Sequence, residues 1–245
     1  MESLALFCSL LFMVSFLYGS VGHGGASGYL ALMAVFGIAP EVMKPTALLL
    51  NVFVSLVSFV QFYRAGHFSR KLFLPFAVAS IPLSFLGGLI LVDGGLYKQM
   101  LGVLLLIPAA RFLFFDDLDE RDPGTPGLLV ALLIGGGIGF LSGLIGIGGG
   151  ILLSPVILLL GWAGQKRTAA ISALFILVNS LSGLAGQVVK GVNFSPDMVL
   201  SVAVVFIGGT AGAYFGAIRF PQKRLKHILA FVLLLAAGKL VFAGI

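Results

Sequence analysis

The sequence has 245 residues, of which 59% are hydrophobic and only 10% are charged, and its mean hydropathy is +1.14. A soluble domain usually carries about 25% charged residues, so this composition excludes an ordinary water-soluble enzyme. The net charge of +6 would suggest nucleic acid as a partner of a soluble protein. In so apolar a chain, however, basic residues are expected in loops and at helix ends, where they orient a membrane protein. No nucleic-acid partner is predicted.

The first apolar segment is predicted to be a mature helix and not a removable signal. A secretory signal begins with a basic region, whereas this chain begins Met1-Glu2-Ser3 and its first basic residue is Lys44. The single cysteine, Cys8, lies in this segment and can build neither a disulfide nor a cysteine metal site within the chain. No metal or cofactor is predicted.

Ten apolar segments follow one another along the chain, and seven approach the roughly 20 residues that a membrane-spanning helix needs. Two have only eleven residues and reach about halfway across a hydrocarbon layer of about 30 Å, so we interpret them as half-helices. The first segment is also short, and it forms with the second either a re-entrant hairpin or two crossings. The segments are 4–18, 27–37, 45–63, 72–92, 96–115, 127–145, 151–161, 168–189, 198–218 and 225–242.

A repeated motif shows that the chain contains a duplication. Phe16–Gly25 (FLYGSVGHGG) aligned with Phe140–Gly149 (FLSGLIGIGG) at a shift of 124 gives six identical positions of ten. The same shift pairs Gly37 with Gly161, at the ends of the two eleven-residue segments. Motif and half-helix therefore recur together, which is typical of an internal repeat.

Each copy holds five apolar segments, and an odd number makes the second copy enter the membrane in the opposite direction. If successive segments cross the membrane in opposite directions, eleven Lys and Arg residues lie on one side and four on the other. The side with eleven is predicted to be cytoplasmic, and both termini are predicted to be external. The predicted fold is an all-α polytopic membrane protein with two inverted repeats of about five helical segments each. The repeats span residues 1–114 and 127–245, with an acidic cytoplasmic linker at 115–126.

The motif GxxGxGG precedes each half-helix. Several glycines within a few residues disfavour a helix by about 0.8–1 kcal/mol each relative to alanine, so we expect broken or re-entrant helices at these glycine-rich loops. Unpaired backbone groups at membrane depth are tolerated only against protein or a watery cavity. Two breaks in inverted copies predict a midplane cavity, where half-helix N-termini favour an anion. The candidate binding residues are Gly22, His23, Gly24, Gly25, Gly146, Gly148, Gly149 and Gly150.

Tight helix packing is the alternative explanation for these glycines, and it is the better one for most of the 34 glycines. Packing alone does not require a doubled glycine before a half-length segment, so function is favoured at the two motifs. A phosphate-binding loop of the Walker type is excluded, because neither motif is followed by Lys-Ser or Lys-Thr.

Polar side chains within the spans give further candidates: Asn51, Asn179, Thr46 and Ser172. An amide is costly in lipid, so Asn51 and Asn179 are expected to face the interior, where they either contact substrate or join helices. All nine acidic residues lie at segment edges or in loops, which disfavours a cation pump and suits a ligand that brings the negative charge. His23 is aligned with Ile147 in the second copy, which leaves its role open.

The paired GxxGxGG motifs, the two-part organisation and a length near 250 residues resemble the TauE/SafE family, the sulfite exporter or toluenesulfonate uptake permease family. The resemblance covers essentially the full chain. It implies a permease for sulfur-containing anions, such as sulfite or organosulfonates, in a bacterial cytoplasmic membrane. The glycine loops of the family correspond to Gly19–Gly25 and Gly143–Gly150. The first copy departs from the pattern at His23 and at Ala26, where the second has Gly150.

The predicted function is a secondary transporter of small sulfur-containing anions, with export as the expected direction and alternating access around the two glycine-rich loops. An anion channel built on the same loops is an alternative that sequence cannot separate. An intramembrane enzyme using Ser27 and His23 is disfavoured, because no carboxylate is placed to orient the histidine. The expected partners are the anion and the lipid bilayer, and a homo-oligomer stays open.

Overall fold

The computed structural model describes the greater part of the chain, and the described residues form helices and turns without any strand. The predicted all-α fold is confirmed, and each predicted apolar segment overlaps helical residues wherever the structure describes it. The described residues are 2–20, 25–114, 124, 126–192, 196–218, 230–231 and 233–240. The helices are α1 (Glu2–Ser20), α2 (Ala26–Val35), α3 (Pro40–Arg64), α4 (Arg70–Leu89), α5 (Gly94–Phe114), α6 (Leu128–Ile145), α7 (Gly150–Leu159), α8 (Gln165–Val189) and α9 (Pro196–Ile218), and residues 230–231 and 233–240 are also helical.

Two helix ends differ from the predicted segments in a way that shapes the site. α3 begins at Pro40 and not at Pro45, because a proline suits the first helical turn, where a backbone N–H would lack a partner. α4 ends at Leu89 and not at Val92, since Ile90 turns to an extended conformation with ψ of 127°. Lys44 therefore lies inside α3, and α4 presents the carbonyl groups of its last turn to neighbouring helices.

The exterior of the bundle is apolar and its interior holds polar groups. Leu129, Leu133 and Val78 expose 69%, 68% and 63% of their surface, whereas Asn51 and Asn179 are fully buried. Such a distribution is the reverse of that in a soluble protein. Four helices, α3, α4, α6 and α8, are long and apolar enough to cross a membrane, and shorter apolar stretches lie in α1, α2, α5, α7 and α9. The protein is a membrane protein.

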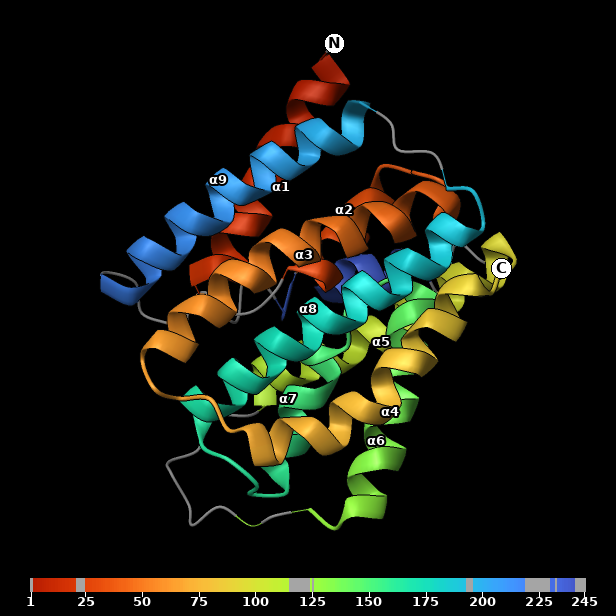
Figure 1. The fold of residues 1–245 in the computed structure, drawn as a ribbon. Helices are drawn as coiled ribbons and strands as arrows, with labels where there is room; N and C mark the ends of the chain where they lie inside the picture. Colours follow the sequence, from red (N-terminus) through yellow and green to blue (C-terminus); the bar gives the residue numbers. More distant parts are fainter. Residues whose placement is uncertain are drawn as a thin grey trace.

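Two pairs of helices pack at backbone contact, α4 against α6 and α1 against α9 (Figure 1). A Cβ atom added to Gly87 in α4 would meet the carbonyl of Phe140 in α6, and one added to Gly212 in α9 would meet the carbonyl of Phe16 in α1. Gly143 in α6 is equally close to α4. Small residues allow such close approach, so packing is the role of these glycines.

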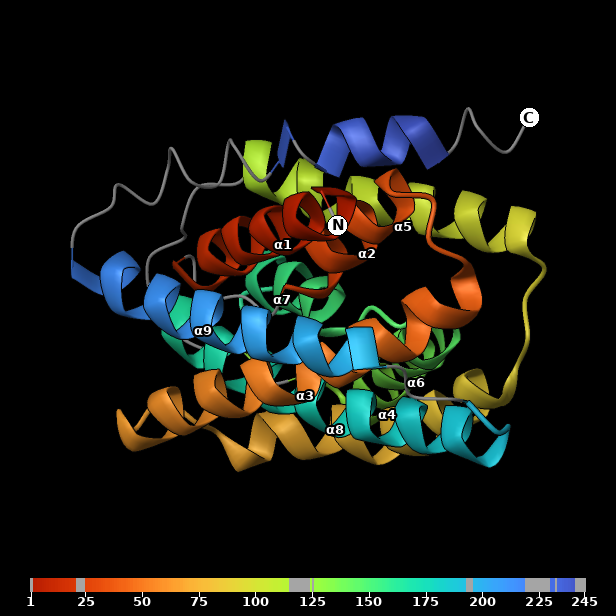
Figure 2. The same ribbon diagram turned by 90° about the horizontal axis from the view of Figure 1, so that it is seen from above.

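The two half-helices lie inside the bundle, and α3 and α8 run side by side across it (Figures 1 and 2). In α2 all residues from Ala26 to Ala34 are buried, and in α7 those from Gly150 to Pro155 are buried. Both helices are apolar all round, which is expected of a fully enclosed helix. Each has ten residues, as predicted for a half-helix.

Candidate functional site

The chain breaks between α6 and α7 as the second glycine motif predicts. Gly146, Gly148 and Gly149 have φ angles of +90°, +79° and +76°, the left-handed region that glycine enters without steric cost. Residues 146–149 form no helix, yet each of them is buried. We call this segment the second loop. The glycines are therefore required by the backbone conformation and not only by packing.

The second loop leads directly into the N-terminus of α7. Leu152 and Leu153 are the first residues of α7 whose N–H groups bond back, both to the carbonyl of Gly149 at 3.0 Å. The N–H groups of the first turn have no carbonyl within their own helix. They add a partial positive charge to the start of the half-helix, where an anion would be stabilised.

Gly148 is the point at which the second loop meets the polar interior. A Cβ atom added there would lie 2.5 Å from Nδ2 of Asn51, 3.0 Å from Ile176 and 3.3 Å from Oγ of Ser180. Asn51 and Ser180 are fully buried, and neither atom of the Asn51 amide nor the Ser180 hydroxyl has a hydrogen-bond partner among the described residues. We call Gly148, Asn51 and Ser180 the loop cluster.

Unpartnered polar atoms cost free energy in a buried position, about 1–3 kcal/mol for each group. The loop cluster concentrates several of them at one point. Two of these groups, the Asn51 amide and the Ser180 hydroxyl, can donate to an oxyanion. A small anion bound at Gly148 would therefore pair groups that the protein itself leaves unpaired.

The second predicted amide, Asn179, precedes Ser180 of the loop cluster in the sequence. Unlike Asn51, it has a hydrogen-bond partner for one of its two side-chain polar atoms. Its Nδ2 donates to the carbonyl of Phe175 at 2.8 Å, and its own backbone carbonyl accepts from Ser84 Oγ at 2.8 Å. Its Oδ1 has no partner among the residues described. Asn179 thus joins α8 to α4 through its backbone, while its side-chain oxygen stays available.

Thr46, Ser172 and Gly150 have contacts of a structural kind. Thr46 Oγ1 donates to the carbonyl of Val42 in its own helix at 2.5 Å. Ser172 Oγ bonds Ser154 Oγ at 2.8 Å, which ties α8 to α7. A Cβ added to Gly150 would collide with the side chain of Ile176. Ser172 and Gly150 fix the packing of α7 against α8, whereas Thr46 bonds only within α3.

The first glycine motif is described in part. Gly22, His23 and Gly24 lie outside the described residues, so their predicted roles stay predictions. Gly25 is buried and precedes α2, and the ring of Tyr29 lies across it. The Tyr29 hydroxyl is buried without a hydrogen-bond partner in the described chain.

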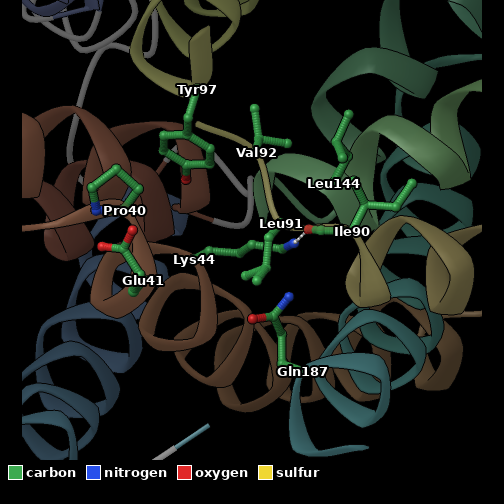
Figure 3. Close-up of a pocket in the computed structure, with 9 residues that line it drawn as sticks. All are labelled: Pro40, Glu41, Lys44, Ile90, Leu91, Val92, Tyr97, Leu144 and Gln187. Atoms are coloured by element: carbon green, nitrogen blue, oxygen red, sulfur yellow. Dashed lines mark hydrogen bonds between the residues drawn. The ribbon is translucent and has the colours of Figure 1, made fainter. Parts of the chain in front are cut away.

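A pocket opens beside the second loop, at the end of α4 (Figure 3). Lys44 is 6% exposed, and its ammonium donates to the carbonyls of Gly87, Gly88 and Ile90 at 3.3, 3.4 and 3.2 Å. Gln187 Nε2 donates to the same Gly88 carbonyl. We call this cavity the Lys44 pocket. Its lining residues are Pro40, Glu41, Lys44, Ile90, Leu91, Val92, Tyr97, Leu144 and Gln187.

Sequence reasoning missed Lys44, which was counted as a loop charge. Ser180 was one of several polar residues within the spans and was not distinguished from the others. The spacing of Lys44 and Asn51, seven residues apart, could have placed both on one face of α3. Among the described residues, no group of three His, Cys, Asp or Glu could hold a metal ion.

Comparison with known proteins identifies relatives of the whole chain. The family model described as Sulfite exporter TauE/SafE matches residues 7–240. Probable membrane transporter protein y4hK of Sinorhizobium fredii is 37% identical over 238 residues, covering 94% of this chain and 95% of that protein. Probable membrane transporter protein YunE of Bacillus subtilis is 26% identical over 229 residues, covering 85% and 83%. The archaeal Probable membrane transporter protein MJ0441 of Methanocaldococcus jannaschii is 28% identical over 193 residues, covering 73% and 72%. No solved structure matches the chain.

Proposed function

The chain belongs to the TauE/SafE family of membrane transporters, and from this premise we propose that it carries small sulfur-containing oxyanions, such as sulfite or organosulfonates. The anion binds at the loop cluster, between the second loop and α3 and α8. The loop N–H groups, the Asn51 amide and the Ser180 hydroxyl supply its hydrogen bonds. Gly149, Gly150 and Ser172 fix the position of the half-helix α7 next to the bound anion. The unpaired Oδ1 atom of Asn179 lies in the same buried interior.

One observation carries this proposal. Asn51 is fully buried, neither atom of its amide has a partner in the described chain, and its Nδ2 lies against the broken backbone at Gly148. An amide buried for packing alone would bond a neighbouring helix, as Ser84 does. A site built of neutral donors and partial charges suits a ligand that carries its own negative charge.

The packing of the helices supports the proposal of two inverted repeats. Gly143 approaches the carbonyl of Ser84, and Gly19 approaches that of Gly209. Gly19 is the counterpart of Gly143, 124 positions earlier in the sequence, and Gly209 is the counterpart of Ser84, 125 positions later. The approaching glycine thus comes from the second copy in the first contact and from the first copy in the second contact. The contact of Gly87 with Phe140 and that of Gly212 with Phe16 are related in the same way. Such reciprocal contacts are expected when repeats 1–114 and 127–245 face each other about a two-fold axis.

The proposed cycle is alternating access, in which the two repeats rock against each other and expose the loop cluster to one side at a time. The positive-inside rule places the linker at 115–126 in the cytoplasm and both termini outside. In this cycle the first motif, with Gly22, His23, Gly24 and Gly25, forms the second wall of the site. Export is the proposed direction, in the cytoplasmic membrane of a bacterium.

A flux panel in liposomes tests this proposal. Purified protein is reconstituted, and uptake of sulfite, thiosulfate, sulfoacetate, sulfate and acetate is measured against protein-free liposomes. We expect saturable flux of one or more sulfur oxyanions with little flux of acetate. A preference for acetate, or conductance far above carrier turnover, would contradict the sulfur-anion carrier and favour a carboxylate carrier or a channel.

A further inference from the structure

We propose that the Lys44 pocket is a second anion-binding site, through which a small oxyanion passes to or from the loop cluster. The anion is held there by the Lys44 ammonium and the Gln187 amide. This inference rests on the proposed function and deepens it, because it assigns a charged residue to the path of the substrate. The loop cluster itself contains no charged side chain.

The ammonium of Lys44 is held loosely. Its three contacts with carbonyl oxygens are 3.2–3.4 Å long, whereas a charged N–H donor usually approaches an acceptor to about 2.7–2.9 Å. Its partners are neutral carbonyls at the C-terminus of α4, where the helix dipole stabilises a cation. An oxyanion would offer a full negative charge at shorter distance, so it can compete with the carbonyls for this lysine.

The carbonyls keep other partners when the lysine turns away. The Gly88 carbonyl accepts from Gln187 Nε2, and the Gly87 carbonyl accepts from the N–H of Ile90 at 3.3 Å. A buried acceptor left without a partner would oppose the movement. These two acceptors stay bonded, and the third, the carbonyl of Ile90, belongs to a residue that is 40% exposed, so Lys44 can exchange its carbonyl contacts for an anion at low cost.

The pocket has room for a small guest. Its cavity of about 30 Å³ corresponds to about two water molecules, which a small oxyanion can replace with a modest shift of the lysine side chain. Figure 3 shows the ammonium at the Ile90 end of the pocket and the Glu41 carboxylate at the Pro40 end. The acidic group and the proposed anion position are therefore at opposite ends.

The Lys44 pocket adjoins the second loop. A Cβ added to Gly146 would lie 3.0 Å from the carbonyl oxygen of Lys44, and Tyr97, in the pocket wall, donates to the carbonyl of Ile145 at 2.7 Å. Asn51 follows Lys44 by seven residues on α3, a rise of about 10 Å. One helix thus carries the cation of the pocket and the amide of the loop cluster.

The buried lysine of the pocket is found in the first repeat only. The residues 124–126 positions after Lys44 are Thr168, Ala169 and Ala170, none of which is charged. The orientation proposed above puts Lys44 near the external side. We therefore infer that the external approach carries a buried cation, whereas the nearest basic residues of the second copy, Lys166 and Arg167, are exposed.

Chemical rescue tests this inference. The only cysteine is first removed by the substitution Cys8→Ser, and Lys44→Cys is then introduced into this background. Sulfite flux into liposomes is then measured before and after alkylation with 2-bromoethylamine, which restores a primary ammonium through a thioether that sulfite does not cleave, or with methyl iodide, which adds a neutral group. We expect Lys44→Cys to lower flux at subsaturating sulfite by roughly 10-fold or more, because a hydrogen bond to a charged group is lost. The aminoethyl reagent, and not the methyl reagent, should restore most of it.

The controls separate this inference from the proposed function. Lys71→Gln removes an exposed charge from the first turn of α4 and should leave flux within about twofold of the background. If Lys44→Cys fails to yield folded protein, Lys44→Gln, which can still donate to the carbonyls, should show the same loss. Normal flux in the neutral Lys44 variants, or equal rescue by both reagents, would overturn the second site while leaving the transporter intact. No sulfite flux in the Cys8→Ser background would overturn both.

Discussion

The α4–α6 interface and the second loop contain the same kinds of residue, glycine beside serine or asparagine, but use them differently. At the interface Gly139 has a helical conformation and packs against Ser80, whose hydroxyl is bonded to the carbonyl of Ala77. At the loop Gly148 has a positive φ and faces Asn51 and Ser180, whose polar side-chain atoms have no partner in the described chain. Glycine content alone therefore does not mark a binding site. The distinguishing features are left-handed backbone and unpaired polar atoms at the same point.

The largest effect is expected from filling the loop cluster. Gly148→Leu would place a side chain against Asn51 and Ser180, in the position proposed for the anion, and would force a left-handed conformation that costs about 1–2 kcal/mol. Sulfite flux should fall by roughly 100-fold or more, since two hydrogen bonds to a charged ligand are lost. Membrane insertion and solubilised yield should persist.

The matched variant is Gly139→Leu at the interface. Its new side chain would collide with the backbone of Ser80, so we expect loss of folded protein and not a selective loss of flux. Size-exclusion profiles and flux per folded molecule distinguish the two outcomes. If both variants lost folded protein alike, the proposed difference between loop and interface would be wrong.

Asn51→Leu should separate function from stability. The substitution removes two unpartnered polar atoms from the interior, so the melting temperature should stay equal or rise, in line with a cost of about 1–3 kcal/mol for such a buried group. Flux should fall roughly 10- to 100-fold, because the ligand loses its amide partner. Thermal unfolding in detergent and liposome flux measure the two effects. A large drop in melting temperature would instead show that Asn51 is structural.

A smaller effect is expected from Ser180→Ala. Its hydroxyl is one donor among several at the loop cluster, so flux should fall roughly 10-fold, the low end of the range of about 1.5–3 kcal/mol for a hydrogen bond to a charged group, with stability unchanged. Ser154→Ala is the matched control. Ser154 bonds Gly150 and Ser172, so its loss should lower stability by about 1 kcal/mol and affect flux less. The reverse pattern would remove Ser180 from the site.

The smallest effect is expected from Gly137→Ala in α6. A Cβ at this exposed position would meet no atom within 4 Å, and alanine favours the helix by up to about 1 kcal/mol. Flux should be unchanged and the melting temperature equal or slightly higher. A marked loss of flux would mean that glycines of α6 outside the second loop also take part in transport.

The fold was predicted well from sequence because its signals are local. Apolar segments gave the helices, and the glycines at positions 146–149 gave the break before α7, since three left-handed residues in four require glycine. The boundary of α3 was wrong by five residues, because hydropathy does not see that Pro40, Glu41 and Lys44 belong to a helix. Helix ends are set by capping and packing, which a hydropathy pattern does not contain.

The site could be predicted only in part, because its function depends on contacts between distant segments. Ser154 and Ser180 look alike in the sequence, yet one is bonded and the other is not. Lys44 was assigned to a loop, whereas its ammonium bonds carbonyls more than 40 residues further along the chain. Which polar group remains unpaired is a property of the assembled bundle, and no local pattern carries it.

The central claim is that the unpaired atoms at Gly148, Asn51 and Ser180 bind a small oxyanion. Ligand-dependent thermal stability of the purified protein tests it most directly, because a ligand that binds the folded state raises stability with its concentration, by about 2.7 kcal/mol at 100 times Kd. We predict that sulfite raises the melting temperature of the wild type in this manner and raises that of Asn51→Leu much less at the same concentration. An equal rise in both proteins, or no rise in the wild type with any anion of the flux panel, would contradict the account.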